Sequence, residues 1–363
     1  MGSRGKILVT GAGGFIGGHI VEILHLTGSR DVVAGIRRWS SCARIGRFPV
    51  ATIKVDLLSE AEVRRALEGV DCVIHCAQGS RGVIVQGTAN LLEAALEKGI
   101  ERIVHLSSIA VYGNASGEVS ESFPYEYTGS EYGDAKIDAE KICFSFCKRG
   151  LPIVILRPSL VYGPYGTDWT LNILRKLAAG SLRGVGSKGE GRCNLLFVHD
   201  LFRAILRALT SRTAIGEAFN INGPEVITWN DYFSRFSRGL GLTASGASDS
   251  RGALLVSGVM EPVRMLGSYV KRNHLARVKT VAARFDLAKR WMKRTEQKLK
   301  ATPSLGDLTF FRRDVVYATR KAEELLGFVP RFGADEGIRI TNEWIRQQGF
   351  SFLGHGRPRE HIS

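Results

Sequence analysis

Short runs of apolar residues alternate with longer amphipathic segments through the first half of the chain. The apolar runs cover residues 6–11, 31–36, 51–57, 71–77, 102–108 and 152–158. Segment 88–99 has apolar residues at helical spacing and ends in a glycine, as helices commonly do. Near-continuous Val/Ile runs alternating with amphipathic helices are typical of a parallel sheet covered on both faces. The pattern therefore predicts a doubly wound α/β domain.

The regular alternation stops after residue 166, and a less regular region follows. Two strand-like runs remain in it, at 194–200 and 218–223. We predict a first domain over 1–165 to which the chain returns around 192–223, and a smaller, partly helical lobe over 166–363. The sequence shows no internal repeat.

Composition favours a soluble globular protein. Of the 363 residues, 44% are hydrophobic and 23% are charged, enough to bury a sizeable core. The N-terminus reaches a glycine-rich turn after one short apolar run, which is too short for a secretory signal, so a cytoplasmic location is expected. The six cysteines lack paired C-x-x-C spacing, which predicts reduced thiols and no metal site.

Much of the formal charge of +15 lies in residues 263–302, which contain twelve Lys or Arg and two acidic residues. The apolar residues of this segment recur at helical spacing, which predicts a basic amphipathic helix. Three interpretations remain open: a helix packed on the second lobe, peripheral contact with an anionic membrane, or a lid over an anionic substrate. Nucleic acid is not expected as a partner, because no aromatic platform accompanies the charge.

A glycine-rich motif, "VTGAGGFIGGHI" at 9–20, follows the first predicted strand and opens a helix. Gly11, Gly14 and Gly17 stand three residues apart. A pyrophosphate at a helix N-terminus meets free N–H groups and a favourable dipole, and it can approach closely only where side chains are absent. The motif in this context predicts a dinucleotide-binding loop.

The end of the second predicted strand indicates which dinucleotide is bound. An acidic residue usually stands there to hold the ribose 2′-hydroxyl, but this chain has Arg37 followed by Arg38. Guanidinium groups suit a 2′-phosphate. NADP is therefore favoured over NAD, and the alternative is that both arginines pair with surface carboxylates.

Further motifs, taken with the glycine loop, resemble the extended short-chain dehydrogenase/reductase family, often described as NAD-dependent epimerases/dehydratases. They are Asp56-Leu57, "LSSIAVYG" at 106–113, Tyr132-x-x-x-Lys136, "LRPSLVYGP" at 156–164 and "ATRKAEELLGFVPRFGADEGI" at 318–338. The resemblance covers nearly the whole chain. It implies a Rossmann fold and an NAD(P)-dependent oxidoreductase or epimerase.

The resemblance places catalysis at Ser108, Tyr132 and Lys136. Hydride transfer to or from a carbinol carbon requires a proton to move on or off its oxygen, and a phenol with a pKa of about 10 is a poor base at neutral pH. The Lys136 ammonium, one helical turn from Tyr132, would lower that pKa. In the family this lysine also bonds the nicotinamide ribose, and the Ser108 position donates to the substrate oxygen.

The resemblance also implies the cofactor contacts. In the family the Asp56 position bonds the adenine amino group, Leu57 is the adjacent backbone contact, and Ala77 lies beside the cofactor. Residues following Pro158 line the nicotinamide. The complete expected set is Gly11, Gly14, Phe15, Ile16, Gly17, Arg37, Arg38, Asp56, Leu57, Ala77, Tyr132, Lys136 and Pro158.

Departures from the family pattern narrow the range of reactions that we expect. Sugar 4,6-dehydratases carry an Asp-Glu pair where this chain has Ile109 and Ala110, so elimination is not expected. The arginine with which many epimerases grip a phosphate falls here on Cys193, with Arg192 one place early, and Ile84 replaces a common asparagine. By analogy, the pattern is closer to the reductase and 3β-hydroxysteroid dehydrogenase-like branch.

Three functions follow as hypotheses. The first is an NADP-dependent enzyme that interconverts a secondary alcohol and a ketone on a sugar derivative, a sterol-like or another cyclic substrate. The second is a nucleotide-sugar epimerase that retains NAD. The third is a catalytically silent, cofactor-bound protein at a membrane surface. A homodimer is compatible with each of them.

Overall fold

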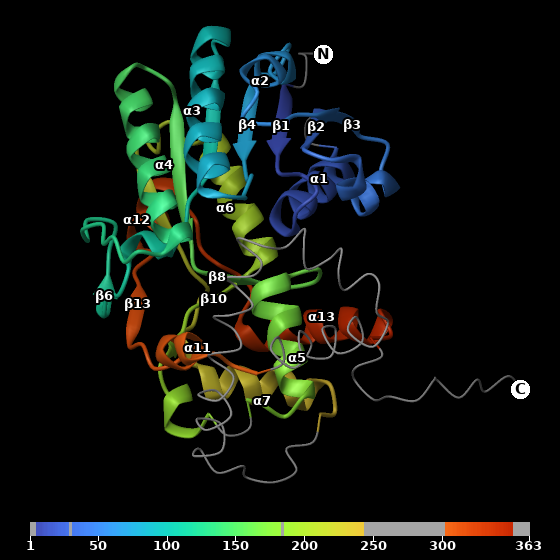
Figure 1. Ribbon diagram of the computed structural model, residues 1–363, viewed down its shortest axis with the longest axis vertical. Coiled ribbons are helices and arrows are strands. Elements are labelled where there is room, and N and C mark those ends of the chain that lie inside the picture. The colour runs from blue at the N-terminus through green and yellow to red at the C-terminus, as the bar shows by residue number, and fades with distance from the viewer. Residues whose placement is uncertain (1–4, 29–30, 183–184, 243–301, 351–363) are drawn as a thin grey trace, which may run out of the picture. The chain divides into compact units, whose positions relative to one another are not determined.

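The computed structural model describes residues 5–28, 31–182, 185–242 and 302–350 (Figure 1). These residues fall into two compact units. The first contains the described residues up to Val161, together with Asn194–Glu225 and Val315–Gly333. The second contains the described parts of Tyr162–Cys193, Val226–Asp314 and Ala334–Ser363.

A parallel sheet of seven strands forms the centre of the first unit, in the order β11-β7-β5-β4-β1-β2-β3. Its strands are β1 (Lys6–Thr10), β2 (Asp31–Ile36), β3 (Ala51–Lys54), β4 (Cys72–His75), β5 (Arg102–Leu106), β7 (Ile153–Pro158) and β11 (Ala218–Ile221). The chain reverses its direction of winding between β1 and β4, where such sheets bind ligands at the carboxyl ends of the strands. The predicted doubly wound Rossmann fold is confirmed, although β3 ends at Lys54 and not at Leu57.

Helices cover both faces of this sheet (Figure 1). One face packs against α1 (Phe15–Thr27), α6 (Val198–Thr210) and α12 (Arg320–Leu326), and the other against α2 (Glu60–Ala66), α3 (Arg81–Lys98) and α4 (Glu131–Lys148). Local sequence sets the helix ends. The Ser59 side chain accepts the Glu62 N–H at the start of α2, and Gly99 ends α3 in the left-handed conformation at φ +67°.

The strand expected at 194–200 is shorter in the structure. Only Leu195–Phe197 forms a strand, β10, and it pairs with β8 (Leu160–Tyr162) outside the main sheet. Val198 begins α6, because apolar residues recur at helical spacing from that point. The return to the main sheet is therefore made by β11.

A C-terminal stretch belongs to the first unit, although the sequence pattern placed it in the second lobe. Strand β13 (Val315–Tyr317) pairs in parallel with β6 (Gly117–Val119). The backbone N–H groups of Arg331 and Phe332 donate to the buried Asp200 carboxylate at 3.0 and 2.8 Å. These long-range bonds hold 315–333 on the first unit.

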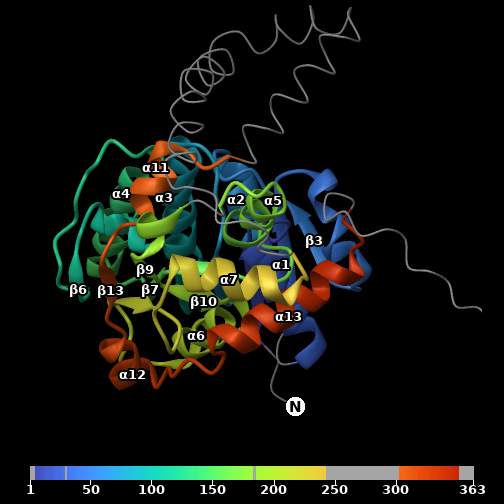
Figure 2. The same cartoon turned by 90° about the horizontal axis from the view of Figure 1, so that it is seen from below.

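The second unit is built around aromatic side chains. Its elements are η4 (Thr167–Leu171), α5 (Asn172–Ala178), η5 (Gly186–Gly189), β9 (Arg192–Cys193), β12 (Ile227–Thr228), α7 (Trp229–Gly239), α11 (Leu305–Phe310) and α13 (Ala334–Gln347). The fully buried Trp229 ring lies 4.5 Å from the Phe311 ring and 5.6 Å from the Trp169 ring, measured between centroids. Helices α7 and α13 lie side by side (Figure 2), and the Asn342 amide donates to the Phe236 carbonyl at 3.3 Å.

No helix among the described residues is long and apolar enough to cross a bilayer. The predicted basic helix at 263–302 lies outside the described residues except for its last position. Its packing, membrane and lid interpretations therefore stay predictions.

Candidate active site

The glycine loop between β1 and α1 is built for close backbone approach. Gly11 adopts φ +69°, and a Cβ there would lie 2.9 Å from the Ala77 Cα. The Gly14 N–H donates to the Gly11 carbonyl at 2.9 Å, and a Cβ on Gly17 would collide with that carbonyl group. Both Gly11 and Gly17 are therefore required by the fold of the loop. The first turn of α1 contains Phe15 and Ile16, which are partly buried against the core.

The segment after β2 packs beside this loop. Arg37 and Arg38 are exposed, and neither forms an ion pair with any residue that the structure describes. The following 3₁₀ helix η1 (Trp39–Ala43) comes so close that a Cβ on Gly13 would lie 2.5 Å from the Ser41 Cβ. Two cations thus stand at the carboxyl end of β2 without a carboxylate partner in the described ranges, where the sequence predicts a 2′-phosphate site.

Asp56 and Leu57 follow β3. The Asp56 side chain accepts the Leu58 N–H at 3.1 Å, and its backbone N–H donates to Glu62 at 2.8 Å. Leu57 is buried, and its carbonyl accepts a hydrogen bond from Asn90 of α3 at 2.9 Å. The backbone at this position is therefore held by bonds to α2 and α3.

Ser108 follows β5 and precedes the 3₁₀ helix η3 (Ile109–Tyr112). Its hydroxyl accepts the Ala110 N–H at 3.1 Å and the side chain is half-buried. The neighbouring Ser107 is buried, and its hydroxyl has no hydrogen-bond partner among the described residues. Ser108 is thus the more accessible of the two hydroxyls.

Tyr132 and Lys136 lie in the first turns of α4, which begins after the capping residue Ser130. Tyr132 is 37% exposed, whereas Lys136 is 3% exposed and donates to the Leu106 carbonyl at the end of β5, at 2.6 Å. The Lys136 Nζ lies 5.8 Å from the centroid of the Tyr132 ring. Burial lowers the pKa of Lys136 to about 8.

Sequence reasoning missed Gln78, which directly follows Ala77. Its side-chain amide donates to the Tyr132 hydroxyl oxygen at 3.1 Å. An N–H donor at a phenol oxygen favours the ionised form of that phenol. The separation of 54 residues between Gln78 and Tyr132 explains why no sequence motif indicated this contact.

A layer of buried polar side chains crosses the sheet near Lys136. The His75 ring bonds to Thr10 at 2.8 Å and to Thr88 at 3.0 Å, and the His105 ring lies 5.2 Å away. Neither His105 nitrogen has a hydrogen-bond partner among the described residues. Burial, assisted by the Lys136 charge, lowers the pKa of His75 to about 3 and holds the pKa of His105 well below 6.5. Both rings are therefore neutral at pH 7.

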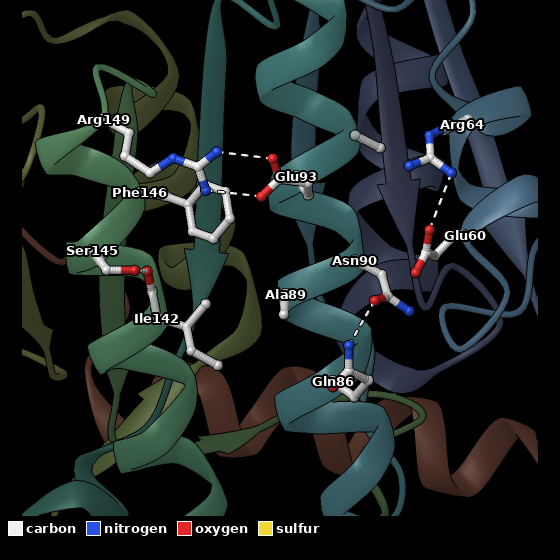
Figure 3. Close-up of a pocket in the computed structure, with 11 residues that line it drawn as sticks. Glu60, Arg64, Gln86, Ala89, Asn90, Glu93, Ile142, Ser145, Phe146 and Arg149 are labelled. Carbon is white, nitrogen blue, oxygen red and sulfur yellow. Dashed lines mark hydrogen bonds and ion pairs between the residues drawn. The ribbon is translucent and has the colours of Figure 1, made fainter.

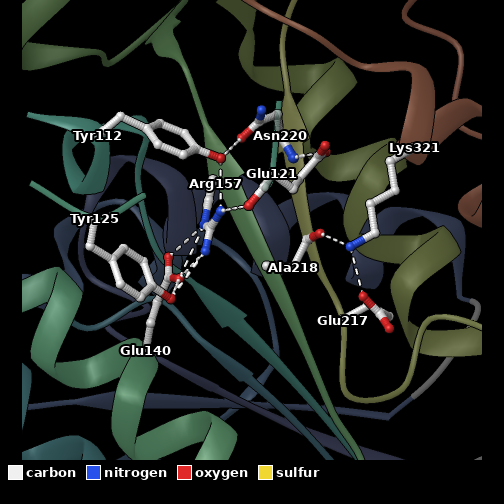
Figure 4. Close-up of polar contacts among 9 residues, drawn as sticks. All are labelled: Tyr112, Glu121, Tyr125, Glu140, Arg157, Glu217, Ala218, Asn220 and Lys321. Atoms are coloured by element: carbon white, nitrogen blue, oxygen red, sulfur yellow. Dashed lines mark hydrogen bonds and ion pairs between the residues drawn. The ribbon is translucent and has the colours of Figure 1, made fainter. Parts of the chain in front are cut away.

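A buried ion pair ties α4, β7 and η3 together (Figure 4). Arg157 of β7 and Glu140 of α4 are 3% and 0% exposed, and they meet at 2.6 Å. Arg157 also donates to the Tyr112 hydroxyl at the end of η3, at 2.7 Å, and to the Tyr125 hydroxyl, at 3.1 Å. Burial alone would lower the pKa of Arg157, but the bonds and charge of Glu140 outweigh it and raise that pKa. Pro158, the expected nicotinamide neighbour, is the next residue and is buried.

A pocket on the outer face of α3 and α4 contains none of the expected site residues (Figure 3). Its charged side chains are already paired. Arg149 donates to both carboxylate oxygens of Glu93 at 2.8 Å, and Arg64 donates to Glu60 at 3.2 Å. In the described part of the chain, no group of three His, Cys, Asp or Glu side chains is placed to hold a metal ion.

Comparison with known proteins gives the family that the sequence motifs resemble and the fold described above. The model of the "NAD dependent epimerase/dehydratase family" matches residues 7–222. A Bacillus subtilis protein named "Uncharacterized UDP-glucose epimerase YtcB" is 34% identical over 253 residues, which are 61% of this chain and 77% of that protein. The Arabidopsis thaliana "3beta-hydroxysteroid-dehydrogenase/decarboxylase isoform 1" is 24% identical over 92% of this chain and 78% of its own. The structure "MoeE5 in complex with UDP-glucose and NAD" superposes with a TM-score of 0.66 at 26% identity, covering 95% of this chain and 99% of that one.

Proposed function

The chain belongs to the NAD dependent epimerase/dehydratase family, whose members are enzymes of the extended short-chain dehydrogenase type, and on this premise we propose that it interconverts a secondary alcohol and a ketone with NADP as cofactor. The observation that carries the cofactor proposal is the pair of exposed arginines, Arg37 and Arg38, which have no ion-pair partner among the described residues. Guanidinium groups recognise a 2′-phosphate by charge and by paired hydrogen bonds. NAD is the alternative cofactor.

The residues around β1 and β2 fit a dinucleotide. The pyrophosphate would lie at the start of α1, against Gly11, Gly14 and Gly17, where side chains are absent and no acidic residue stands in the first helical turn. Asp56 and Leu57 would contact the adenine, and Ala77 and Pro158 the nicotinamide half. The bound cofactor supplies the hydride acceptor or donor.

Tyr132, Ser108 and Lys136 would then move and hold the proton of the reacting group. In the oxidising direction the substrate hydroxyl loses its proton to Tyr132 as hydride leaves the carbinol carbon, and in the reducing direction the same proton returns. Ser108 donates to the substrate oxygen, and the Lys136 charge and the Gln78 amide favour the ionised tyrosine. Gln78 takes this role because its side-chain amide donates to the Tyr132 oxygen.

Residues at which the chain departs from the family pattern support a choice of substrate class. Cys193, at the position of the epimerases' phosphate-gripping arginine, is fully buried, and Arg192 is paired with Asp314 at 3.2 Å. Neither residue supports recognition of a nucleotide phosphate. Ile109 and Ala110 offer no acid or base for elimination. We therefore favour a sterol-like or other cyclic alcohol, in line with the Arabidopsis relative.

A nucleotide-sugar epimerase with retained NAD is the second candidate, favoured by the Bacillus subtilis relative and by the UDP-glucose complex with the same fold. Peripheral membrane contact through 263–302 is a further proposal. Co-sedimentation with anionic and neutral liposomes tests that contact, and equal recovery with both lipids would contradict it.

Native mass spectrometry of the purified protein tests the cofactor, because the masses of retained NAD and NADP differ. Turnover is then measured with 3β-hydroxysterols and with UDP-sugars as two separate panels. The Tyr132→Phe variant is expected to keep its cofactor affinity and to lose most turnover. Unchanged turnover in that variant would refute the assignment of Tyr132, and turnover of UDP-sugars alone, with NAD retained, would favour the epimerase.

A further inference from the structure

Trp39 is the most exposed tryptophan that the structure describes. The residue is 62% exposed, whereas Trp229 is fully buried and Trp169 and Trp344 are partly buried. An exposed aromatic side chain by itself is ordinary on a protein surface. Its position makes Trp39 informative, because it directly follows the exposed cations Arg37 and Arg38 at the carboxyl end of β2.

The backbone that carries Trp39 is fixed beside the phosphate loop. The Ser41 N–H donates to the Arg38 carbonyl at 2.9 Å, and Ser41 packs on Gly13 with no room for a side chain between them. Immediately after η1, Arg44 donates to Glu22 of α1 at 2.6 Å and to the Phe15 carbonyl at 3.2 Å. The segment from 37 to 44 is therefore held against the glycine loop through Ser41 and against α1 through Arg44.

We propose that Trp39 is the stacking platform for the adenine ring of the dinucleotide, an inference that rests on the proposed function. In a fold of this kind the adenosine half of the cofactor lies over the carboxyl end of β2. The indole face can stack on adenine, which every nicotinamide dinucleotide carries. Trp39 therefore adds affinity for NAD and NADP alike, whereas Arg37 and Arg38 distinguish between them by the 2′-phosphate.

Binding of defined nucleotides tests this division of roles without knowledge of the substrate. Calorimetry measures the affinities of 2′,5′-ADP, NADP and NAD for the full chain. Trp39→Ala is expected to weaken all three by a similar factor of about fivefold or more, the lower end of the range for one base stacked on an aromatic ring. Trp39→Phe keeps a stacking face and recovers most of the affinity. Leu26→Ala is the matched control, because Leu26 is 68% exposed near the end of α1 and is expected to leave every affinity unchanged.

Arg37→Asp separates this inference from the cofactor proposal. That variant is expected to weaken 2′,5′-ADP and NADP and to spare NAD. If Trp39→Ala weakens all three ligands while Arg37→Asp changes none, the platform stands and the NADP preference fails. Unchanged affinities in Trp39→Ala, or weakening no greater than in Leu26→Ala, would overturn the platform whatever Arg37→Asp does. A wild-type chain that binds neither dinucleotide would refute both proposals.

Discussion

The buried pair of Arg157 and Glu140 allows a quantitative test of what holds β7 and α4 together. Replacing Arg157 by Met leaves the Glu140 carboxylate fully buried without its cation, and replacing Glu140 by Met leaves the guanidinium buried without its anion. Breaking a buried pair on one side costs about 3–5 kcal/mol of unfolding free energy, because an uncompensated charge remains in a medium of low polarity. Each single variant is expected to lose that amount.

The double variant removes both charges and is expected to cost less than the sum of the single losses, by the coupling free energy between the two positions. It still loses something, because the Tyr112 and Tyr125 hydroxyls no longer receive the Arg157 N–H groups. The coupling free energy between the two positions is expected to be about 2–3 kcal/mol. This value measures the cost of a lone buried charge and does not measure the net stability of the intact pair.

Urea-induced unfolding followed by circular dichroism supplies the four unfolding free energies of the cycle, provided that the denaturant slope is the same for each variant. The bidentate pair of Arg149 and Glu93 is the matched control, since it also joins the α4 region to a neighbouring element but is exposed to solvent. Solvent screening leaves such a pair with little coupling. If the coupling of the buried pair does not exceed that of the exposed pair, the burial argument is wrong.

Three further outcomes are expected. Burial lowers the pKa of His75 from 6.5 to about 3, so between these pH values the ring takes up a proton only when the protein unfolds. The free energy of unfolding therefore decreases as the pH falls through this range, by about 1.4 kcal/mol per pH unit. In His105→Phe, which removes the second such ring, the loss of stability between pH 7 and pH 5, measured by urea unfolding, should be smaller. Gly17→Ala places a methyl group against the loop backbone and should weaken NADP binding at least about tenfold by calorimetry. Gln78→Leu removes the donor to Tyr132, so the turnover profile should move to higher pH, and an unchanged profile would exclude that role.

The sheet and the phosphate loop could be predicted because their signals are local. Apolar runs in the first half of the chain predicted strands that the structure contains, with differences mainly at their ends. The glycine spacing predicted the loop, since Gly11 needs a positive φ and Gly17 has no room for a side chain. The 194–200 strand was predicted too long, because Val198 continues the apolar run of the strand although α6 begins at that residue.

The polar contacts of the site were not predictable in the same way. Gln78 meets Tyr132 across 54 positions in the sequence, and Arg157 reaches the Tyr112 hydroxyl across 45. Such pairs depend on strand order and register, which bring separate carboxyl ends together and which no local periodicity encodes.

Local sequence is thus sufficient for the layered fold, the dinucleotide loop and the tyrosine–lysine spacing on one helix, because each is a matter of backbone conformation or of hydrophobic periodicity within a few turns. The tertiary structure decides the surroundings of the side chains at the site. It buries Lys136 against the Leu106 carbonyl, leaves Tyr132 accessible beside Gln78, and keeps the arginines after β2 unpaired with any described carboxylate. Burial and long-range pairing set the charge and reach of a side chain, and both arise only when distant segments pack together.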